Sequence, residues 1–478
     1  MGDNSRFFFV LTAIGAAVGI GSRWAFPFYL HIFGAWFYLA YFTALVLLGI
    51  PLLMTEFSFS QYKEKNIVDS YFSISRFAGS IGWFMVFNAF MLMSIYAVRL
   101  GWHIIYIFVS FGTQWKGRAE SYFFNNVLQV SGADDFAKLS LTVFLSLILA
   151  WLAVYPLIRK GFESLKNSYV YLLTAGSFLM IAFFLYSLTL EKSLAGVYSL
   201  FHGSFSVFSM EMWIAAFSLA AVSLGASFGI MHAISRNAKG FMVRSASMAV
   251  LFELLVSIAL GFILFSILGF MAFEQGTGLN GALFSEYSST FTVLSEGFTH
   301  MASPSLLSFL FFLFLGIFFL IGTSSLAFSV VSLLSQKLKT SERNAAVIVC
   351  GFGFIFGLAY AIKPGYYAME LMSHYIYYNI LIALLFSAIA IFWISKAGGR
   401  ISKFIDNLSF IKAGKLWHMI MKYFTPVILA VLIVYQIAAD WHGFKNYPSW
   451  AVLVFGIGTV AVPAAAAFMM PKDMISKR

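Results

Sequence analysis

The chain alternates long apolar runs with short polar connections. A helix needs about 20 apolar residues to cross a hydrocarbon core of about 30 Å. Runs of this kind, nearly free of charge, occur at residues 7–30, 34–60, 80–110, 139–158, 168–188, 211–235, 246–273, 304–335, 344–362, 369–395, 424–439 and 449–470. The pattern therefore predicts twelve transmembrane helices.

Composition leads to the same class of protein. The chain has 478 residues, of which 61% are hydrophobic and 10% charged, whereas a soluble domain has about 45–50% and 25%. The longest connections, 111–138, 274–303 and 396–423, are too short to form a separate catalytic domain. We expect one membrane domain over residues 1–478, and an integral membrane enzyme ranks lowest because the histidines show no metal-binding spacing.

The distribution of Lys and Arg predicts the orientation of the chain in the membrane. The net charge is +11, and cytoplasmic loops of membrane proteins are enriched in Lys and Arg. The two termini and the even-numbered connections hold 22 Lys and Arg residues, the odd-numbered connections six. The asymmetry predicts a multi-pass protein of the cytoplasmic (inner) membrane with both termini in the cytoplasm. Because topology explains the positive charge, we expect no nucleic-acid partner.

Two runs contain matching interruptions. Residues 16–22 read AAVGIGS and are followed by Trp24 and Pro27, while residues 220–227 read AAVSLGAS. The two copies lie five spans apart and would enter the membrane from opposite sides, which predicts inverted repeats over residues 1–190 and 205–395, followed by helices over 424–470. Interrupted helices at matching positions indicate a midplane site for an ion and a small solute. The alternative is that these small residues only permit close helix packing.

The motifs resemble those of the neurotransmitter:sodium symporter family, in an atypical, bacterial leucine-transporter-like form. The similarity lies in residues 13–21 (AIGAAVGIG) with Trp24, Phe26 and Pro27, then in 49–53 (GIPLL), Glu56-Phe57, Tyr96, Ser223-Leu224-Gly225 and Thr323-Ser324-Ser325. The resemblance implies an all-α membrane fold of twelve helices, with a 5+5 inverted repeat, broken helices 1 and 6, and two C-terminal helices.

The resemblance also implies one sodium site in good order. Its ligands would be the carbonyls of Gly15, Val18 and Leu320 and the hydroxyls of Thr323 and Ser324. All are hard oxygen donors, which suit Na⁺, and they would join span 1 to span 8. Alternatively, the two hydroxyls only bond back to their own helix.

The other ion site departs from the family pattern at Ala17, Ser22, Ala221 and Glu253. The family usually has Asn where Ser22 and Glu253 stand, and Ser or Thr where Ala221 stands. A charged side chain at mid-span costs about 2.5–3.5 kcal/mol on insertion scales. We therefore expect Glu253 to coordinate a cation, to carry a proton that replaces one sodium, or to neutralise Arg23 or Arg99. Ser257 could sit near a chloride site.

The gates differ as well. The usual outer pair of Arg and Asp reads Ala25 and either Met372 or Ser373 here. Arg23, Arg99 and Glu370 could form a substitute cluster, or their long side chains could simply extend to the membrane surface. Tyr171 stands where many members have a helix-loosening proline, so the inner opening is expected to use other residues, such as Gly176.

The substrate site implied by the resemblance would hold a carboxylate on the span-1 amides and the Tyr96 hydroxyl. No Asp occupies the position of Gly19, where monoamine carriers have one, which favours an amino acid-like substrate. Small residues in span 6 widen the pocket unless Phe217, Phe228 or Phe328 fills it, and these are interpreted mainly as packing residues. The candidate substrate residues are Ala16, Gly19, Gly21, Tyr96, Ala220, Ser223, Ala226 and Ser325.

Three functions remain open at this point. The favoured one is a sodium-coupled symporter of an amino acid or similar solute, working by alternating access without an organic cofactor. The second is a proton-coupled or exchange carrier of an organic amine, with H⁺ carried by Glu253. The third is a membrane sensor that uses the same fold without transport.

Overall fold

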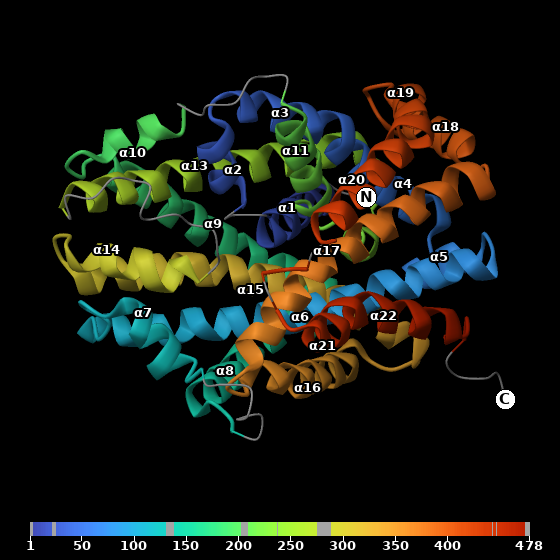
Figure 1. Ribbon diagram of the computed structural model, residues 1–478. Helices are drawn as coiled ribbons and strands as arrows, with labels where there is room; N and C mark the ends of the chain where they lie inside the picture. Colours follow the sequence, from blue (N-terminus) through green and yellow to red (C-terminus); the bar gives the residue numbers. More distant parts are fainter. Residues whose placement is uncertain are drawn as a thin grey trace.

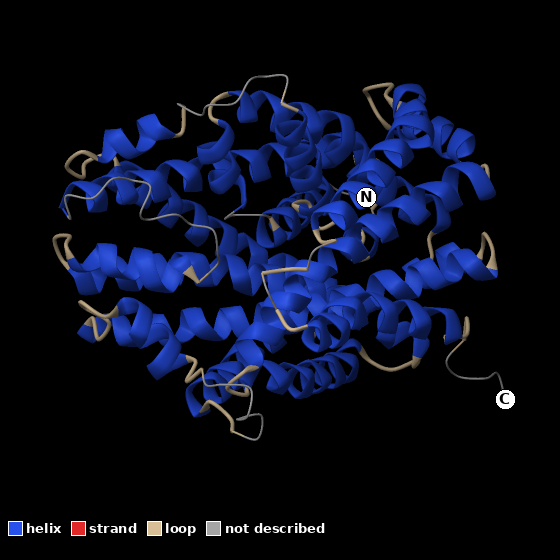
Figure 2. Ribbon diagram, viewed as in Figure 1, coloured by secondary structure: helices blue, strands red, loops and turns tan. Residues whose placement is uncertain are grey.

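The fold is built from helices. The computed structural model describes residues 3–21, 25–130, 138–201, 209–236, 238–274, 288–441, 443–445 and 447–473. Over these residues every regular element is helical and no strand occurs (Figure 2). This confirms the predicted all-α class, in which each backbone group finds its partner inside its own helix, as the membrane interior requires.

The first half of the chain contains eleven α-helices within the described residues. They are α1 (Asp3–Ile20), α2 (Ala25–Phe33), α3 (Trp36–Ala44), α4 (Ile50–Lys63), α5 (Ile67–Phe72), α6 (Arg76–Val109), α7 (Ala119–Ser121), α8 (Leu141–Ile158), α9 (Phe162–Ser187), α10 (Ser193–Ser199) and α11 (Met210–Val222). A π-helical turn, Leu45–Gly49, joins α3 to α4 without a break, a 3₁₀ turn at Ser110–Gly112 extends α6, and a second π-helical segment, Tyr122–Val127, follows α7.

The second half of the chain is also built from helices over its described residues. Its described α-helices are α12 (Ile230–Ser235), α13 (Met242–Glu274), α14 (Ser295–Thr299), α15 (Pro304–Lys337), α16 (Glu342–Ala361), α17 (Gly365–Ile389), α18 (Gly398–Leu408), α19 (Gly414–Met419), α20 (Thr425–Ala439), α21 (Ser449–Ala451) and α22 (Gly458–Met469). Further π-helical turns lie at Thr290–Leu294, Ala390–Ile394, Ile420–Phe424 and Val452–Ile457.

Ten helices among the described residues are long and apolar enough to cross a membrane. A bent pair, Arg6–Ile20 and Ala25–Phe33, would make an eleventh span. The predicted run 211–235 is divided into α11 and α12, each too short to span alone, because the segment 223–229 interrupts it. The multi-pass membrane fold is therefore confirmed, and the total of twelve spans stays a prediction.

Two long helices form the centre of the molecule. α6 and α15 run side by side across its middle, with α16 and α22 to one side and α1, α9 and α13 to the other (Figure 1). α1 packs against both α13 and α15, and α9 packs against α1 and α15. The interrupted first span is thus enclosed by helices distant in sequence.

Polar residues at helix starts fix where the helices begin. The side chains of Ser75, Ser140 and Ser341 accept hydrogen bonds from backbone N–H groups three residues further on, at the starts of α6, α8 and α16. Such caps satisfy donors that the first helical turn leaves unpaired. The serines that precede the apolar runs therefore locate these membrane helices.

Candidate functional site

The first interruption ends α1. The Gly21 N–H still donates to the Ala17 carbonyl (2.8 Å), and the helix stops after Ile20. The chain resumes as α2 at Ala25, and the axes of the two helical parts differ by 63°. Of the predicted residues, Ser22, Arg23 and Trp24 lie outside the described residues. α1 thus ends within the predicted interruption, and the broken first span stays a prediction.

The second interruption lies between α11 and α12. Gly225, Ser227 and Gly229 all have positive φ angles (69°, 72° and 70°), so the helix cannot continue through them. The Ser227 N–H donates to Glu56 Oε1 on α4 (2.6 Å), and the Ser329 hydroxyl donates to the Phe228 carbonyl (2.7 Å). Side chains from other helices therefore form hydrogen bonds with backbone groups that lack a helical partner here. The Glu56-Phe57 motif marked Glu56 in the sequence, but its role here was not predicted.

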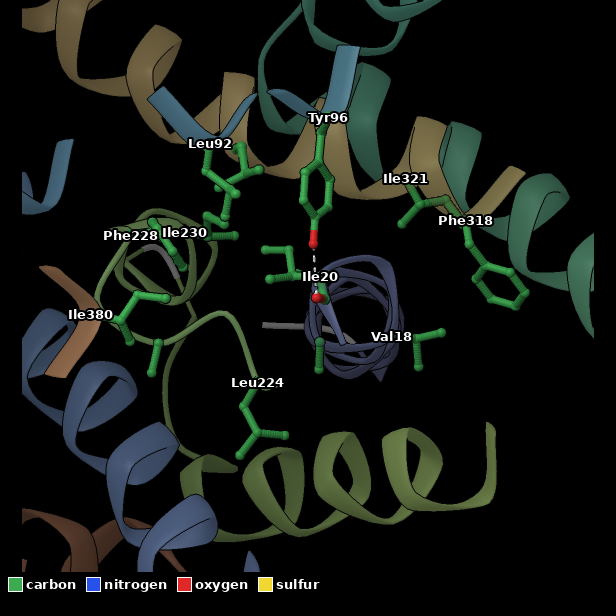
Figure 3. Packing of buried hydrophobic residues seen from close by; sticks show 14 of the residues in the cluster. Val18, Ile20, Leu92, Tyr96, Leu224, Phe228, Ile230, Phe318, Ile321 and Ile380 are labelled. Carbon is green, nitrogen blue, oxygen red and sulfur yellow. Dashed lines mark hydrogen bonds between the residues drawn. The ribbon is translucent and has the colours of Figure 1, made fainter. Parts of the chain in front are cut away.

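The two interruptions meet in space. A Cβ placed on Gly225 would lie 2.9 Å from Ile20 Cδ1 at the end of α1. The Tyr96 hydroxyl, from α6, donates to the Ile20 carbonyl (3.1 Å), as the dashed line in Figure 3 shows. Ile20, Leu224 and Tyr96 thus come from three separate spans and lie around the end of α1 (Figure 3). Interrupted backbone at membrane depth is tolerated where it lines a site or a cavity.

α1 approaches α15 closely at the candidate sodium site. A Cβ on Gly19 would lie 2.7 Å from the Gly322 nitrogen, so only glycine permits this contact. Thr323 and Ser324, just beyond Gly322, are fully buried. Their hydroxyls donate to the Phe319 carbonyl (2.7 Å) and the Ile321 carbonyl (3.0 Å) of their own helix. The structure brings the predicted helices together, with the hydroxyls in the back-bonded arrangement that the sequence left open.

A tyrosine from α9 enters the same region. The Tyr169 hydroxyl donates to the Ile321 carbonyl (2.9 Å) and lies 3.2 Å from Ser324 Oγ, with Ser325 Oγ also within hydrogen-bond distance. A Cβ on Gly15 would lie 2.5 Å from the Tyr169 ring. Tyr169 therefore contacts predicted sodium ligands on both α1 and α15. The sequence pattern does not single out Tyr169, because nothing nearby in the chain distinguishes it from other tyrosines in the predicted spans.

Glu253 lies in a buried polar cluster. Its side chain is 2% exposed, and the Tyr41 hydroxyl lies 2.9 Å from Oε2 and 3.1 Å from Oε1. The Ser257 hydroxyl donates to Oε1 (3.1 Å), and Tyr41 also bonds Ser223 (3.1 Å). A Cβ on Gly21 would come within 3.4 Å of Glu253 Oε1. The carboxylate thus lies against Gly21 at the end of α1. Ala17 and Ala221, the other altered positions, are both buried.

Two of the possible gate residues, Arg99 and Glu370, form hydrogen bonds with different residues. Arg99 Nη2 donates to Ser373 Oγ on α17 (3.2 Å). Glu370 forms an ion pair with Lys445 (2.6 Å) and accepts a hydrogen bond from Tyr447, because it lies beside the segment that follows α20. The substitute gate of Arg23, Arg99 and Glu370 stays a prediction. Arg23 lies outside the described residues.

The candidate substrate residues all lie in the interior. Ala16, Ala220 and Ala226 are buried, and the Ser223 and Ser325 hydroxyls are engaged with Tyr41 and Tyr169. Two of the phenylalanines that could fill the pocket pack against other aromatic rings: Phe217 contacts Phe424, and Phe328 contacts Phe162. Both contacts agree with their interpretation as packing residues.

A cavity of about 430 Å³ lies next to both interruptions. Its walls come from α2, α11, α17 and α20 and include Ala25, Val222 and Ser373. Ala25 is the first residue after the break in span 1, and Val222 the last before the break in span 6. The cavity therefore borders the helix ends at both interruptions.

The known proteins to which the chain is similar include sodium-dependent transporters. A model of the sodium:neurotransmitter symporter family matches residues 3–117 and 113–476. An uncharacterized sodium-dependent transporter of Methanocaldococcus jannaschii is 26% identical, over 97% of this chain and 95% of its own length. The human sodium- and chloride-dependent taurine transporter is 25% identical, over 94% of this chain and 80% of its own. A sodium-dependent nutrient amino acid transporter of Drosophila yakuba is 23% identical, over 95% and 81%.

Proposed function

The chain belongs to the sodium:neurotransmitter symporter family, and on that premise we propose that it is a sodium-coupled symporter of an amino acid or amino acid-like solute. The family consists of transporters, so the chain is a transporter and not an enzyme. The resemblance of its motifs to this family is confirmed. The observation that carries the proposal is the meeting of two interrupted spans beside a cavity.

The coupling ion in this proposal is Na⁺. It would bind between α1 and α15, with the carbonyls of Gly15, Val18 and Leu320 and the hydroxyls of Thr323 and Ser324 as ligands. The close approach at Gly19 and Gly322 and the burial of both hydroxyls support this donor set. The relatives described as sodium-dependent support the choice of ion.

The substrate is proposed to bind where the interruptions meet. Its carboxylate would use the backbone N–H groups of the first break and the hydroxyl of Tyr96, which would exchange its bond to the Ile20 carbonyl for the substrate. The relatives named for taurine and for nutrient amino acids favour solutes with an amino group and an acidic group. Buried alanines in span 6 leave room for the rest of the solute.

Glu253 is proposed to replace the missing ligands of the other ion site. Its donors, Tyr41 and Ser257, stabilise the ionised carboxylate, and its position against Gly21 aims it at the first break. The alternative role, neutralisation of Arg23 or Arg99, would make Glu253 a structural residue; the Arg99 guanidinium donates a hydrogen bond to Ser373. The same buried carboxylate favours a second candidate function, a carrier in which Glu253 takes up a proton instead of a cation.

The proposal also covers the repeats, the membrane orientation and the outer gate. Residues 1–190 and 205–395 form the two inverted repeats, and residues 424–470 form the added helices. Both termini would lie in the cytoplasm, and the protein would occupy the cell membrane. Arg99 and Ser373 would close the outer side in place of the usual family pair, since their hydrogen bond joins α6 to α17.

Uptake into liposomes tests the proposed function. Purified protein is reconstituted, and uptake of labelled amino acids and amines is measured with an inward Na⁺ gradient, with an inward H⁺ gradient and with neither. We expect uptake of an amino acid that requires Na⁺. Uptake driven only by H⁺ would select the proton-coupled carrier, and binding of solute without uptake under any gradient would select the sensor.

A further inference from the structure

We propose that the Tyr169 hydroxyl competes with Na⁺ at the α1–α15 site and thereby sets the sodium affinity of the transporter. The inference rests on the proposed function, because it assumes that Na⁺ uses this site. It concerns a residue of α9 that supplies none of the predicted ligands.

Tyr169 is placed to contact both sides of the site. Its side chain is fully buried, and its ring lies against Gly15, whose missing Cβ would otherwise come within 2.5 Å of the ring. Its hydroxyl reaches α15 at the Ile321 carbonyl (2.9 Å) and at Ser324 Oγ (3.2 Å). One phenol thus connects α9, α1 and α15 where sodium is proposed to join α1 to α15.

The bonding of Ser324 explains the competition. Ser324 Oγ donates its proton to the Ile321 carbonyl (3.0 Å), and the Tyr169 hydroxyl donates to the same carbonyl (2.9 Å). The phenol oxygen therefore lies 3.2 Å from Ser324 Oγ, beside the oxygen whose lone pairs would coordinate Na⁺. In this proposal the ion and the phenol compete for the space next to Ser324 Oγ. Sodium entry then requires the phenol to move away from Ser324.

The same contact stabilises the site when sodium is absent. Without Tyr169, Gly15 of α1 would lose the α9 ring packed against it, and Ser325 would lose its partner. When sodium is absent, the phenol thus provides hydrogen bonds to α15 near the proposed ion position. Sodium binding would release α9 from α15, since Tyr169 provides the hydrogen bonds between these two helices at this level.

Tyr171 provides a matched control on the same helix. It lies two residues beyond Tyr169 and is 77% exposed, facing away from the packed interior. Tyr169→Phe and Tyr171→Phe each remove one phenolic oxygen from α9 and leave the ring. Only the first change removes a group that contacts Ser324.

The test measures the sodium concentration that gives half-maximal effect. Two readouts are used on full-length reconstituted protein: Na⁺-driven uptake, and the thermal stabilisation that a ligand of the folded state confers. A net hydrogen bond contributes about 0.5–1.5 kcal/mol, which corresponds to roughly a two- to tenfold change in affinity. We expect Tyr169→Phe to lower the half-maximal sodium concentration by this factor, to lower the melting temperature without sodium, and to enlarge its rise with sodium.

Other results for the half-maximal sodium concentration would overturn the inference. A half-maximal concentration that is unchanged in Tyr169→Phe makes Tyr169 purely structural, and one that rises makes it a sodium ligand. Either result overturns the inference and leaves the proposed function standing. A wild-type protein without any sodium response overturns both. If Tyr169→Phe does not fold, Ser325→Ala, which removes a hydrogen-bond partner of the phenol, must lower the sodium concentration for half-maximal thermal stabilisation. Thermal stabilisation is used here because Ser325 is a candidate substrate residue, which would affect uptake directly.

Discussion

At the scale of single residues, the buried carboxylate of Glu253 has the largest consequences. It is held by hydroxyls from α3 and from its own helix, and it faces the break in span 1. A buried charge at this depth is costly unless it has donors and a cation or a proton. The Tyr41 and Ser257 hydroxyls supply two donors, and the proposed cation or proton at Glu253 is the part that a substitution tests.

Replacing Glu253 with Gln tests this directly. Gln keeps the size of the side chain and one oxygen for Tyr41 but removes the charge. We expect a loss of sodium-driven uptake by roughly tenfold or more, equivalent to at least about 1.4 kcal/mol. The measurement is initial uptake rate against Na⁺ concentration at several pH values. Intact uptake with an unchanged pH profile would make Glu253 a structural residue, and Tyr41→Phe serves as the milder comparison.

Gly15 allows a second test at this scale. A Cβ there would lie 2.5 Å from the Tyr169 ring, whereas a Cβ on Gly351 in α16 would meet nothing within 4 Å. We expect Gly15→Ala to destabilise the protein by about 1–3 kcal/mol through overpacking. Gly351→Ala should be neutral or stabilising by up to about 1 kcal/mol, since Ala favours helix. Thermal unfolding of both variants checks this, and equal effects would contradict the packing at Gly15.

At the scale of elements, the interrupted spans depend on special backbone conformations. The segment between α11 and α12 contains three residues with positive φ, and the Ser227 N–H donates to the Glu56 carboxylate of α4. Glycine adopts such angles without strain, while other residues pay about 1–2 kcal/mol. The break is therefore fixed by backbone chemistry and by side chains brought from another helix.

Gly225→Ala is predicted to disturb this break. Gly225 has φ of 69°, and its added Cβ would lie 2.9 Å from Ile20 Cδ1. Gly117 has a similar φ of 72° but open space around it. We expect Gly117→Ala to cost only the backbone strain and to leave uptake unchanged. Gly225→Ala should also reduce uptake severalfold, because it separates the two interruptions. Equal uptake in both variants would argue against a role for that contact.

At the scale of the whole molecule, the distribution of charge makes a prediction about orientation. Lys116 lies in an odd-numbered connection and Lys403 in an even-numbered one, and both are exposed. In a Cys350→Ala background, an impermeant thiol reagent should label Lys116→Cys on intact cells. Lys403→Cys should be labelled only after the membrane is made permeable. The opposite pattern would reverse the proposed topology, and labelling of both on intact cells would contradict it.

The sequence alone determined the elements of this protein. Membrane helices are identified by their own apolar length, so most predicted runs agree with the helices to within a few residues. The interruptions were identified as well, because glycine and small residues act on the backbone locally. The family resemblance then selected Gly15, Thr323, Ser324 and the departures at Glu253, since these positions lie inside or beside recognisable motifs.

Only the tertiary structure decided which side chains meet. Tyr41 reaches Glu253 across 212 residues of chain, Tyr169 reaches Ser324 across 155, and Arg99 takes Ser373 while Glu370 takes Lys445. Such contacts depend on how helices far apart in sequence approach and rotate against one another. That geometry is set by packing over the entire interior and leaves no mark in any local pattern, which is why Tyr169 could be recognised only in the folded protein.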